Sequence, residues 1–250
     1  MTSRIVILLS GAFLLGCGGM NPTDSGPASN AALNGSWHIS LTSATPGVTS
    51  TLDLFIIQNG GALSSDQVAL GTTCSSVGTM SGSVTGNQLN ILVTGNNGDT
   101  VSITGMASTG SFTGSYTSKT SGCGVTGETG MVSAELIPPV TSTSWTGSTQ
   151  STRYTGNTTF TANLSEDSSG NVTGVLMFTS STGVSASCPP LVGTNSITAT
   201  QTGNQMGFSD NQPDGLSGFV TMDSAAKNLT GVYGVSICSG DNGVFTMSRP

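Results

Sequence analysis

The chain has 250 residues, of which 7% are charged, and its formal net charge is −7. Glycine alone contributes 36 residues, and Ser, Thr and Asn stand where a typical soluble protein has charged side chains. This composition excludes a highly charged disordered chain, and the scarcity of Lys and Arg argues against a nucleic-acid partner.

The first 16 residues have the pattern of a signal peptide. Arg4 precedes an apolar run from Ile5 to Leu15, which is too short to span a bilayer stably. The run ends in "LLGC", which resembles the lipobox of bacterial lipoproteins, although that family prefers Ala or Ser where Leu15 stands. The resemblance implies cleavage before Cys17 and a lipid anchor on Cys17, with acyl chains such as palmitate. The alternative is an ordinary secretory signal with a chance cysteine.

Gly18 follows the lipidated position. In Gram-negative lipoproteins an Asp at this place retains the protein at the inner membrane, so the resemblance implies the outer membrane. Whether the chain then faces the periplasm or the exterior stays open. Residues 17–34 are rich in Gly, Pro, Ser and Asn, which predicts a lipidated flexible tether.

The rest of the chain is predicted to be a tandem duplication. "GSWHIS" at 35–40 matches "TSWTGS" at 143–148, "TGNQLNI" at 85–91 matches "TGNQMGF" at 202–208, and "SFTGSYTS" at 111–118 matches "NLTGVYGV" at 228–235. The matches occur in the same order in both halves. We therefore expect a first β domain at 35–137, a linker at 138–142 that is stiffened by Pro138 and Pro139, and a second β domain at 143–250.

Each copy is predicted to be all-β, because apolar residues alternate with polar ones and helical periodicity is absent. Gly114 and Gly231 fall in mid-strand, where glycine permits the strong coiling of a small closed barrel. These features favour two antiparallel meander β-barrels, with β-sandwiches as the alternative. The "GSW" opening also resembles the start of lipocalins and avidin-like barrels, the calycin group.

The cysteines predict one disulfide in each copy. If Cys17 is lipidated, four remain, and four cysteines allow three pairings. If each copy folds alone, the pairs are Cys74–Cys123 and Cys188–Cys238. A zinc site is not expected, because no two cysteines have the spacing of a zinc motif and His38 is the only histidine.

Candidate catalytic groups are few, and we predict no catalytic residues, metal or cofactor. His38 is interpreted as a barrel-end or surface residue, Glu166 and Asp167 as part of a solvated turn, and Asp241 as part of a hairpin turn. A ligand pocket at a barrel mouth could be lined by the largest aromatic side chains, although the core is the favoured place for them: Trp37, Tyr116, Trp145 and Tyr233.

The sequence thus predicts a lipid-anchored protein of the bacterial envelope with a non-catalytic role in binding, adhesion or scaffolding. Its expected partners are the membrane, through the anchor, and an envelope protein, a glycan or a small apolar ligand. A calycin-like carrier of a small apolar ligand is the alternative, and it requires a large internal cavity. A carboxylate-dependent hydrolase is a third hypothesis, and it requires two acids that converge in one cleft.

Overall fold

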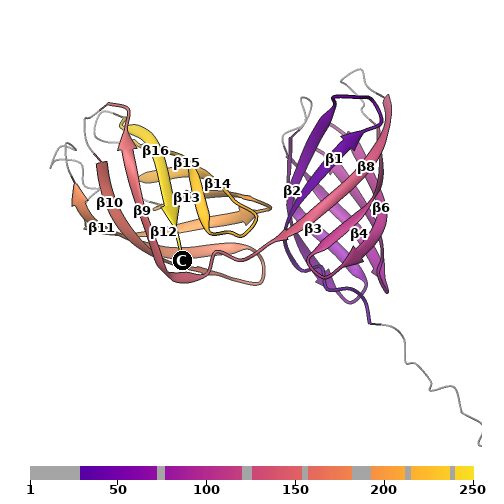
Figure 1. The fold of residues 1–250 in the computed structure, drawn as a ribbon, viewed down its shortest axis with the longest axis horizontal. Helices are drawn as coiled ribbons and strands as arrows, with labels where there is room; N and C mark the ends of the chain where they lie inside the picture. The colour runs from indigo at the N-terminus through magenta and orange to yellow at the C-terminus, as the bar shows by residue number, and fades with distance from the viewer. Residues whose placement is uncertain are drawn as a thin grey trace, which may run out of the picture.

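The computed structural model describes residues 29–71, 77–119, 126–153, 157–181, 193–211, 215–236 and 240–250. Within these ranges the chain forms two closed antiparallel barrels, one after the other along the sequence (Figure 1). The predicted all-β class and the tandem barrels are confirmed, and closure of both sheets decides against the sandwich alternative.

Barrel 1 is a simple meander in which each strand pairs with the next and β8 returns to pair with β1. Its strands are β1 (Gly35–Ser43), β2 (Thr49–Asn59), β3 (Ala62–Leu70), β4 (Val77–Thr85), β5 (Gln88–Gly95), β6 (Thr100–Ser108), β7 (Ser111–Lys119) and β8 (Thr126–Ile137).

Barrel 2 repeats this topology, with β16 closing against β9. Its strands are β9 (Ser142–Ser151), β10 (Asn157–Glu166), β11 (Asn171–Ser181), β12 (Gly193–Thr202), β13 (Gln205–Ser209), β14 (Leu216–Met222), β15 (Asn228–Val235) and β16 (Asn242–Ser248).

Alternation along each strand decides which side chains enter the barrel. In β5, Leu89, Ile91 and Val93 are buried and the residues between them are exposed, as the period of two in the sequence predicts. Mid-strand glycines let the strands approach closely. A Cβ atom on Gly114 would collide with the carbonyl oxygen of Thr104 on β6, and one on Gly231 with that of Phe219 on β14. Both positions therefore need glycine, which supports the predicted coiling.

Aromatic rings fill the described interiors. In barrel 1 the ring centroids of Trp37 and Phe112 are 5.1 Å apart. In barrel 2 the Phe245 ring lies 4.9 Å from Phe160 and 5.0 Å from Phe208, centroid to centroid. Rings at these distances are in contact, so they form the cores of both barrels.

The segment that precedes each barrel packs against the core of that barrel. The Trp37 indole donates a hydrogen bond to the carbonyl oxygen of Leu33 at 2.7 Å, and the Trp145 indole donates one to that of Val140 at 3.0 Å. Leu33 and Val140 are themselves fully buried. The end of the region that the sequence assigns to the tether thus packs against barrel 1.

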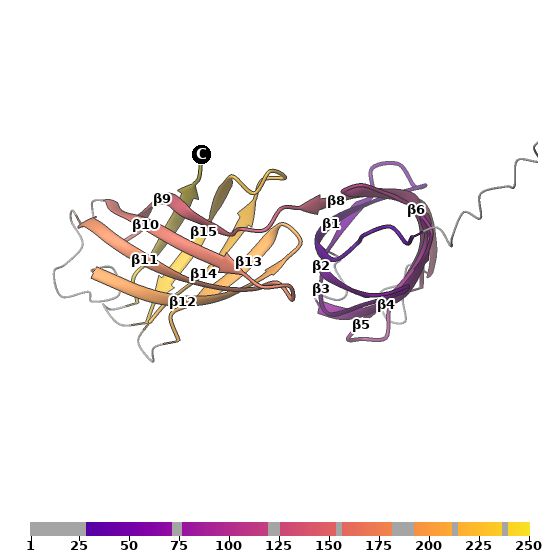
Figure 2. The same ribbon diagram turned by 90° about the horizontal axis from the view of Figure 1, so that it is seen from below.

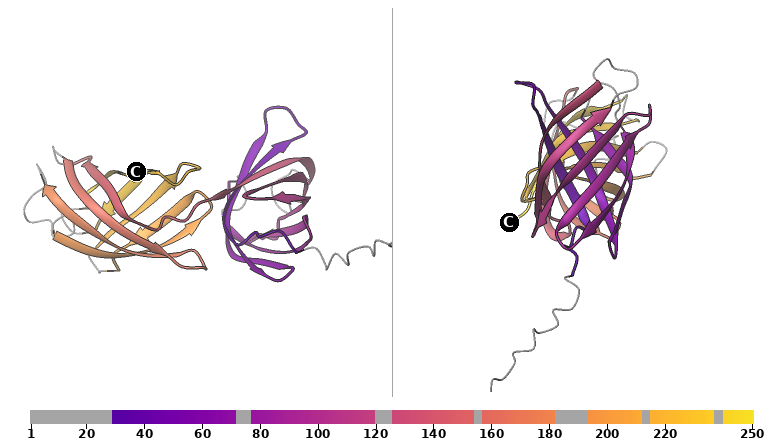
Figure 3. Two further views of the ribbon diagram at one scale, coloured as in Figure 1. Left: turned by 60° about the horizontal axis from the view of Figure 1, so that its bottom comes forward. Right: turned by 90° about the vertical axis from the view of Figure 1, so that its right-hand side faces the viewer.

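Barrel 2 presents one of its ends to the wall of barrel 1. Figure 2 looks along barrel 1 and shows barrel 2 from the side, and the left view of Figure 3 shows the same arrangement from another direction. The turn between β10 and β11, with Gly170, lies against Phe55 of β2. The turn between β12 and β13, with Gly203, lies against Asp53 of β2 and the backbone of Trp37. We call this contact the junction.

Candidate functional site: the junction and the cleft beside it

The junction is built on an outward-facing part of β2. Leu52, Leu54 and Ile56 point into barrel 1, so Asp53 and Phe55 point outward. Both are nonetheless buried, and Asp53 is only 2% exposed. A strand with one face in a barrel core loses solvent on its other face only when something covers it. Here the end of barrel 2 is the cover.

A single carboxylate joins the two barrels. His38 Nδ1 of β1 donates to Asp53 Oδ1 at 2.7 Å. From barrel 2, the backbone amide of Asn204 donates to the same oxygen at 3.2 Å, and Gln205 Nε2 donates to Asp53 Oδ2 at 3.3 Å. A buried carboxylate needs such donors because burial removes its water. Asp53 therefore ties barrel 2 to β1 and β2.

A second set of hydrogen bonds surrounds Gln201, at the end of β12. Ser36 Oγ of barrel 1 donates to the Gln201 carbonyl oxygen at 3.4 Å, and Gln201 Nε2 donates to the carbonyl oxygen of Pro138 in the linker at 3.4 Å. The Gln201 side-chain oxygen is buried and accepts no hydrogen bond. The interbarrel contact is thus polar at its centre, and the linker is part of it.

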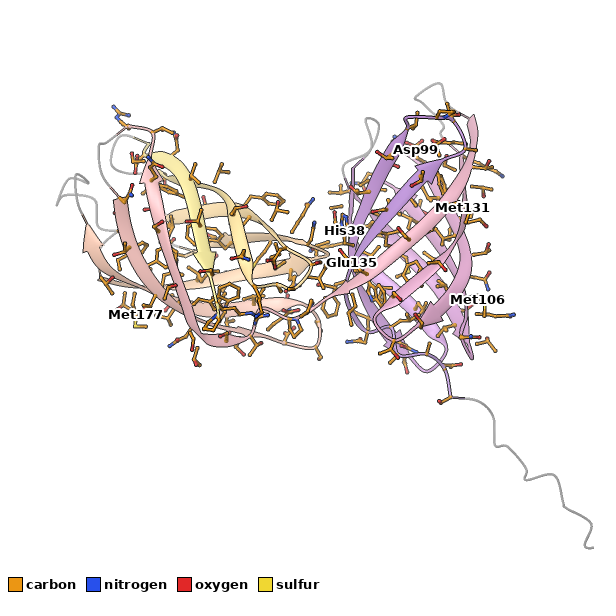
Figure 4. All side chains as sticks on the ribbon, in the orientation of Figure 1. His38, Asp99, Met106, Met131, Glu135 and Met177 are labelled. Carbon is orange, nitrogen blue, oxygen red and sulfur yellow. The ribbon has the colours of Figure 1, made fainter. Side chains whose placement is uncertain are left out.

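The electrostatics of His38 follow from this arrangement. The hydrogen bond to Asp53 raises the pKa of His38 above its ordinary value of 6.5, the charges of Asp53 and Glu135 raise it further, and burial opposes them. Figure 4 places His38 and Glu135 on the side of barrel 1 that faces barrel 2. Of the two places expected for His38, the barrel end is wrong, because it lies mid-strand; it is a residue of the outer wall, and the junction leaves 22% of its side chain exposed.

The pairing of His38 with Asp53 resembles part of a catalytic relay, which also needs a nucleophile. Among the described residues, no Ser or Thr hydroxyl is bonded to His38. Both oxygens of Asp53 also receive donors from barrel 2. The geometry gives this pair a structural role at the junction.

A cleft of about 470 Å³ opens beside the junction, between the wall of barrel 1 and the end of barrel 2. Barrel 1 contributes residues of β3, β4 and the turn after β5, and barrel 2 contributes residues of β12, β13 and β14. We call this the interbarrel cleft. Its lining residues are Asp66, Gln67, Val68, Ala69, Val77, Gly78, Thr79, Asn96, Thr200, Thr202, Gln205, Gly207 and Phe219.

The interbarrel cleft differs from the other described surface hollows in its lining, although its volume is similar to theirs. Three further hollows of about 430 to 560 Å³ are each lined by one barrel only. The cleft instead draws on both barrels, and Gln205 belongs both to its lining and to the junction. Its volume is within the range of small-molecule sites. It also exposes two apolar side chains, Val77 at 48% and Phe219 at 47%.

The aromatic residues predicted as pocket-lining lie mainly in the barrel cores. Trp37 and Trp145 are fully buried and bonded to backbone carbonyls. Tyr116 donates to Glu128 Oε1 at 2.8 Å, and Tyr233 donates to Asp241 Oδ2 at 3.0 Å. Burial, aided by the bond to Glu128, raises the pKa of Tyr116 to about 12. None of the four lines the interbarrel cleft.

Asp241 is more than a turn residue. It is almost fully buried and also accepts a hydrogen bond from Ser151 Oγ at 2.5 Å. Each barrel therefore has a tyrosine on its seventh strand bonded to a carboxylate at the start of its last strand. Such matching contacts support the interpretation of the two barrels as copies of one unit.

The adjacent acids Glu166 and Asp167 have separate structural roles. Glu166 Oε2 accepts the backbone amide of Val140 at 2.9 Å, so it holds the linker, and burial raises its pKa. Asp167 Oδ1 accepts the amides of Ser169 and Asn171 at 2.8 and 3.0 Å, and its bonds to Asn171 and Ser169 lower its pKa. The interpretation of Glu166 as a solvated turn residue is wrong, because the linker covers it.

Several predicted features fall outside the described residues. These are the signal peptide, Cys17 and the four cysteines at 74, 123, 188 and 238, so the lipid anchor and both disulfides stay predictions. Within the described ranges, no group of three or more His, Cys, Asp or Glu is placed to hold a metal ion. Nor does that part of the chain contain a helix long and apolar enough to cross a membrane.

Comparisons with known proteins add little beyond this. No family model matches the chain, and no curated protein matches it. Among solved structures, a DUF3598-family protein of unknown function from Nostoc punctiforme aligns with a TM-score of 0.27 and 9% identity, over 87% of this chain and 96% of that one. Transferrin Binding Protein B from Haemophilus parasuis aligns with a TM-score of 0.26 and 10% identity, over 86% of this chain and 44% of that one. Scores and identities this low establish no family, ligand or partner.

Proposed function

We propose that this chain is a lipid-anchored protein of the bacterial outer membrane with a non-catalytic binding role, and that it binds its ligand in the interbarrel cleft. The anchor rests on the lipobox-like "LLGC" at Cys17. The binding role rests on one structural observation: the cleft is lined from both barrels and is fixed in shape by the buried Asp53 carboxylate.

Aromatic side chains fill the described interiors of both barrels, so a ligand site is expected outside them. Trp37 and Phe112 meet inside barrel 1, and Phe160, Phe208 and Phe245 meet inside barrel 2. A carrier of a small apolar ligand needs room at these places. The cleft, in contrast, offers exposed apolar and polar side chains together, which is the usual composition of a ligand site.

The positions of the carboxylates argue against a hydrolase. Asp53, Glu128, Glu166, Asp167 and Asp241 each accept hydrogen bonds that hold a strand, a turn or the linker. Paired catalytic carboxylates would instead face each other across a substrate cleft. Of the acids in the described ranges, Asp66 alone lines the interbarrel cleft.

The test is a chemical-shift map of the full chain in detergent micelles, titrated with a fragment set that contains neutral, acidic, basic and apolar members, including palmitic acid. We expect at least one fragment to shift backbone amides of both 77–79 and 205–219. Shifts confined to inward-facing residues with palmitic acid would support the carrier instead. No shift at the cleft with any fragment would reject the proposed site.

A further inference from the structure

The chemistry of the interbarrel cleft restricts its ligand. The cleft is lined by apolar side chains, by amide and hydroxyl side chains and by one carboxylate, that of Asp66, and none of its described lining residues is Lys, Arg or His. An anionic ligand would therefore enter without a counter-charge, beside Asp66 and on a chain whose net charge is −7. Phosphate, sulfate and carboxylate groups are thus disfavoured.

A purely apolar ligand fits the lining no better. Asn96, Gln67 and Gln205 carry amides, and Thr79, Thr200 and Thr202 carry hydroxyls. An apolar molecule that covered these groups would remove their water without replacing its hydrogen bonds, which costs free energy for each group left unpaired. The exposed surface of the lining is mostly apolar, so the ligand must present an apolar face to it and also donate and accept hydrogen bonds where these amides and hydroxyls stand.

Phe219 supplies the remaining constraint. It points outward from β14, between Gly218 and the fully buried Val220, and 47% of it is exposed. Only a few of the described large hydrophobic side chains are this exposed, and Phe219 is the one aromatic among them. Val77 of β4 lines the same cleft from barrel 1. A flat ring and a branched aliphatic group in one cleft suit a ligand that has an apolar face.

A neutral molecule with a hydroxyl-rich edge and an apolar C–H face is a saccharide ring. We propose that the interbarrel cleft binds a neutral saccharide of one or two rings, with Phe219 as the platform on which one sugar face packs, and with the amide side chains of Gln67, Asn96 and Gln205 bonding its hydroxyls. This inference rests on the proposed function, because it names the ligand class of the same cleft.

The junction gives this site a defined shape. Gln205 donates to Asp53, and the neighbouring Asn204 amide does so as well. The strand that carries Gln205 is therefore fixed to barrel 1 at one end of the cleft. Preorganised polar groups lose less entropy on binding, which matters for a ligand with many weak hydrogen bonds.

The experiment compares probes on the full chain in detergent micelles. The neutral probes are glucose, N-acetylglucosamine, maltose and lactose. Their anionic counterparts are glucuronic acid and glucose 6-phosphate for glucose and N-acetylglucosamine 6-phosphate for N-acetylglucosamine, and octanoate is the apolar probe. Binding is measured by calorimetry and by backbone amide shifts. We expect at least one neutral saccharide to shift amides of 77–79 and 205–219, and its anionic counterpart to bind more weakly.

Two matched variants locate the contact. Phe219→Ala removes the platform, and Val244→Ala removes an exposed apolar side chain of β16, which does not pair with β14 and lies outside the cleft. We expect Phe219→Ala to weaken saccharide binding about tenfold, as for the loss of one aromatic contact, and Val244→Ala to leave it unchanged. Thermal unfolding of both variants controls for folding, and Val77→Ala tests the opposite side of the cleft.

The outcomes separate the two proposals. If charged or apolar fragments shift the cleft amides and no neutral saccharide does, the saccharide inference is overturned while the proposed function stands. Equal weakening by Phe219→Ala and Val244→Ala also overturns it. If no probe of any class shifts the cleft amides, both proposals are rejected.

Discussion

Replacing Asp53 by Asn is expected to loosen the junction without unfolding either barrel. The substitution keeps the shape of the side chain, and the residue points outward from β2, so the core of barrel 1 is untouched. The new amide has one oxygen that can still accept a hydrogen bond. Its NH2 group takes the Oδ2 position, because the Oδ1 position faces two donors, His38 Nδ1 and the Asn204 amide; there Gln205 can turn its side-chain amide so that its oxygen accepts from the new NH2 group.

The size of the effect follows from the bonds that cross the junction. A hydrogen bond to a charged group contributes about 1.5–3 kcal/mol and a neutral one about 0.5–1.5 kcal/mol, so each of the two bonds from barrel 2 loses about 1 kcal/mol. Because Gln205 can turn its amide, no buried group is left unpaired. A total of roughly 2 kcal/mol lowers the ratio of docked to undocked barrels about thirtyfold.

Hydrogen exchange at the Asn204 amide measures this effect directly, because Asp53 is its acceptor. We expect faster exchange in Asp53→Asn and a broader distribution of interbarrel orientations in small-angle scattering. Asp99→Asn is the matched control, since Asp99 is a buried carboxylate of barrel 1 that accepts from Asn97 in the turn between β5 and β6, at one end of the barrel (Figure 4). Wild-type exchange at Asn204 in Asp53→Asn, or equal loosening by Asp99→Asn, would refute the role of Asp53.

Three further predictions follow from the same structure. The raised pKa of His38 comes from Asp53 and Glu135, which both belong to barrel 1, so its protonated form stabilises folded barrel 1. This contribution is complete below about pH 6.5, the ordinary pKa of histidine, and is lost as pH rises through the higher pKa of the folded state. The unfolding temperature should therefore fall more between mildly acidic and alkaline buffer in the wild type than in His38→Gln, and an identical pH profile in the two would contradict this. Gly203 and Gly86 stand in equivalent turns with φ of +59° and +60°, but a Cβ on Gly203 would meet Asp53 whereas one on Gly86 would meet nothing within 4 Å. Gly86→Ala should lower the free energy of unfolding by about 1 kcal/mol through backbone strain alone, whereas Gly203→Ala should also open the junction. Identical small-angle scattering from the two variants would count against this docked arrangement. Finally, full-length protein from a bacterial host should take up labelled palmitate, Cys17→Ser should not, and intact mass after alkylation should show two disulfides; label retained in Cys17→Ser would reject the anchor.

The barrels themselves were predictable because their determinants are local. The alternation of Leu89, Ile91 and Val93 fixes which face of β5 is buried, whatever the rest of the chain does. Gly114 and Gly231 could be interpreted as coiling positions because a side chain in mid-strand conflicts with a neighbouring backbone. Because these patterns occur in both halves of the sequence, they predict the tandem arrangement.

The junction and the cleft were not predictable, because burial there depends on the other barrel. In "TLDLFIIQ" the alternation places Asp53 and Phe55 on the outward face, and nothing in the sequence indicates that this face is buried. Phe219 is likewise outward, and an aromatic side chain on the polar face of a strand is the one usable signal in the sequence for a contact there. The side-chain period of a strand reports which face a residue is on, and it does not report what that face meets.

The comparison of the two copies shows where such a contact can be found from sequence. His38 and Asp53 are directly paired across β1 and β2, and the equivalent pair across β9 and β10 is Thr146 and Thr161. One copy thus has an ion-pairing couple and the other a neutral couple at the same place in the barrel. In barrel 1 that place is covered by the end of barrel 2, and buried polar groups there need hydrogen-bond partners. In barrel 2 the corresponding Thr146 is exposed to solvent. Departures from the repeat, more than the repeat itself, therefore locate the surface on which the copies meet.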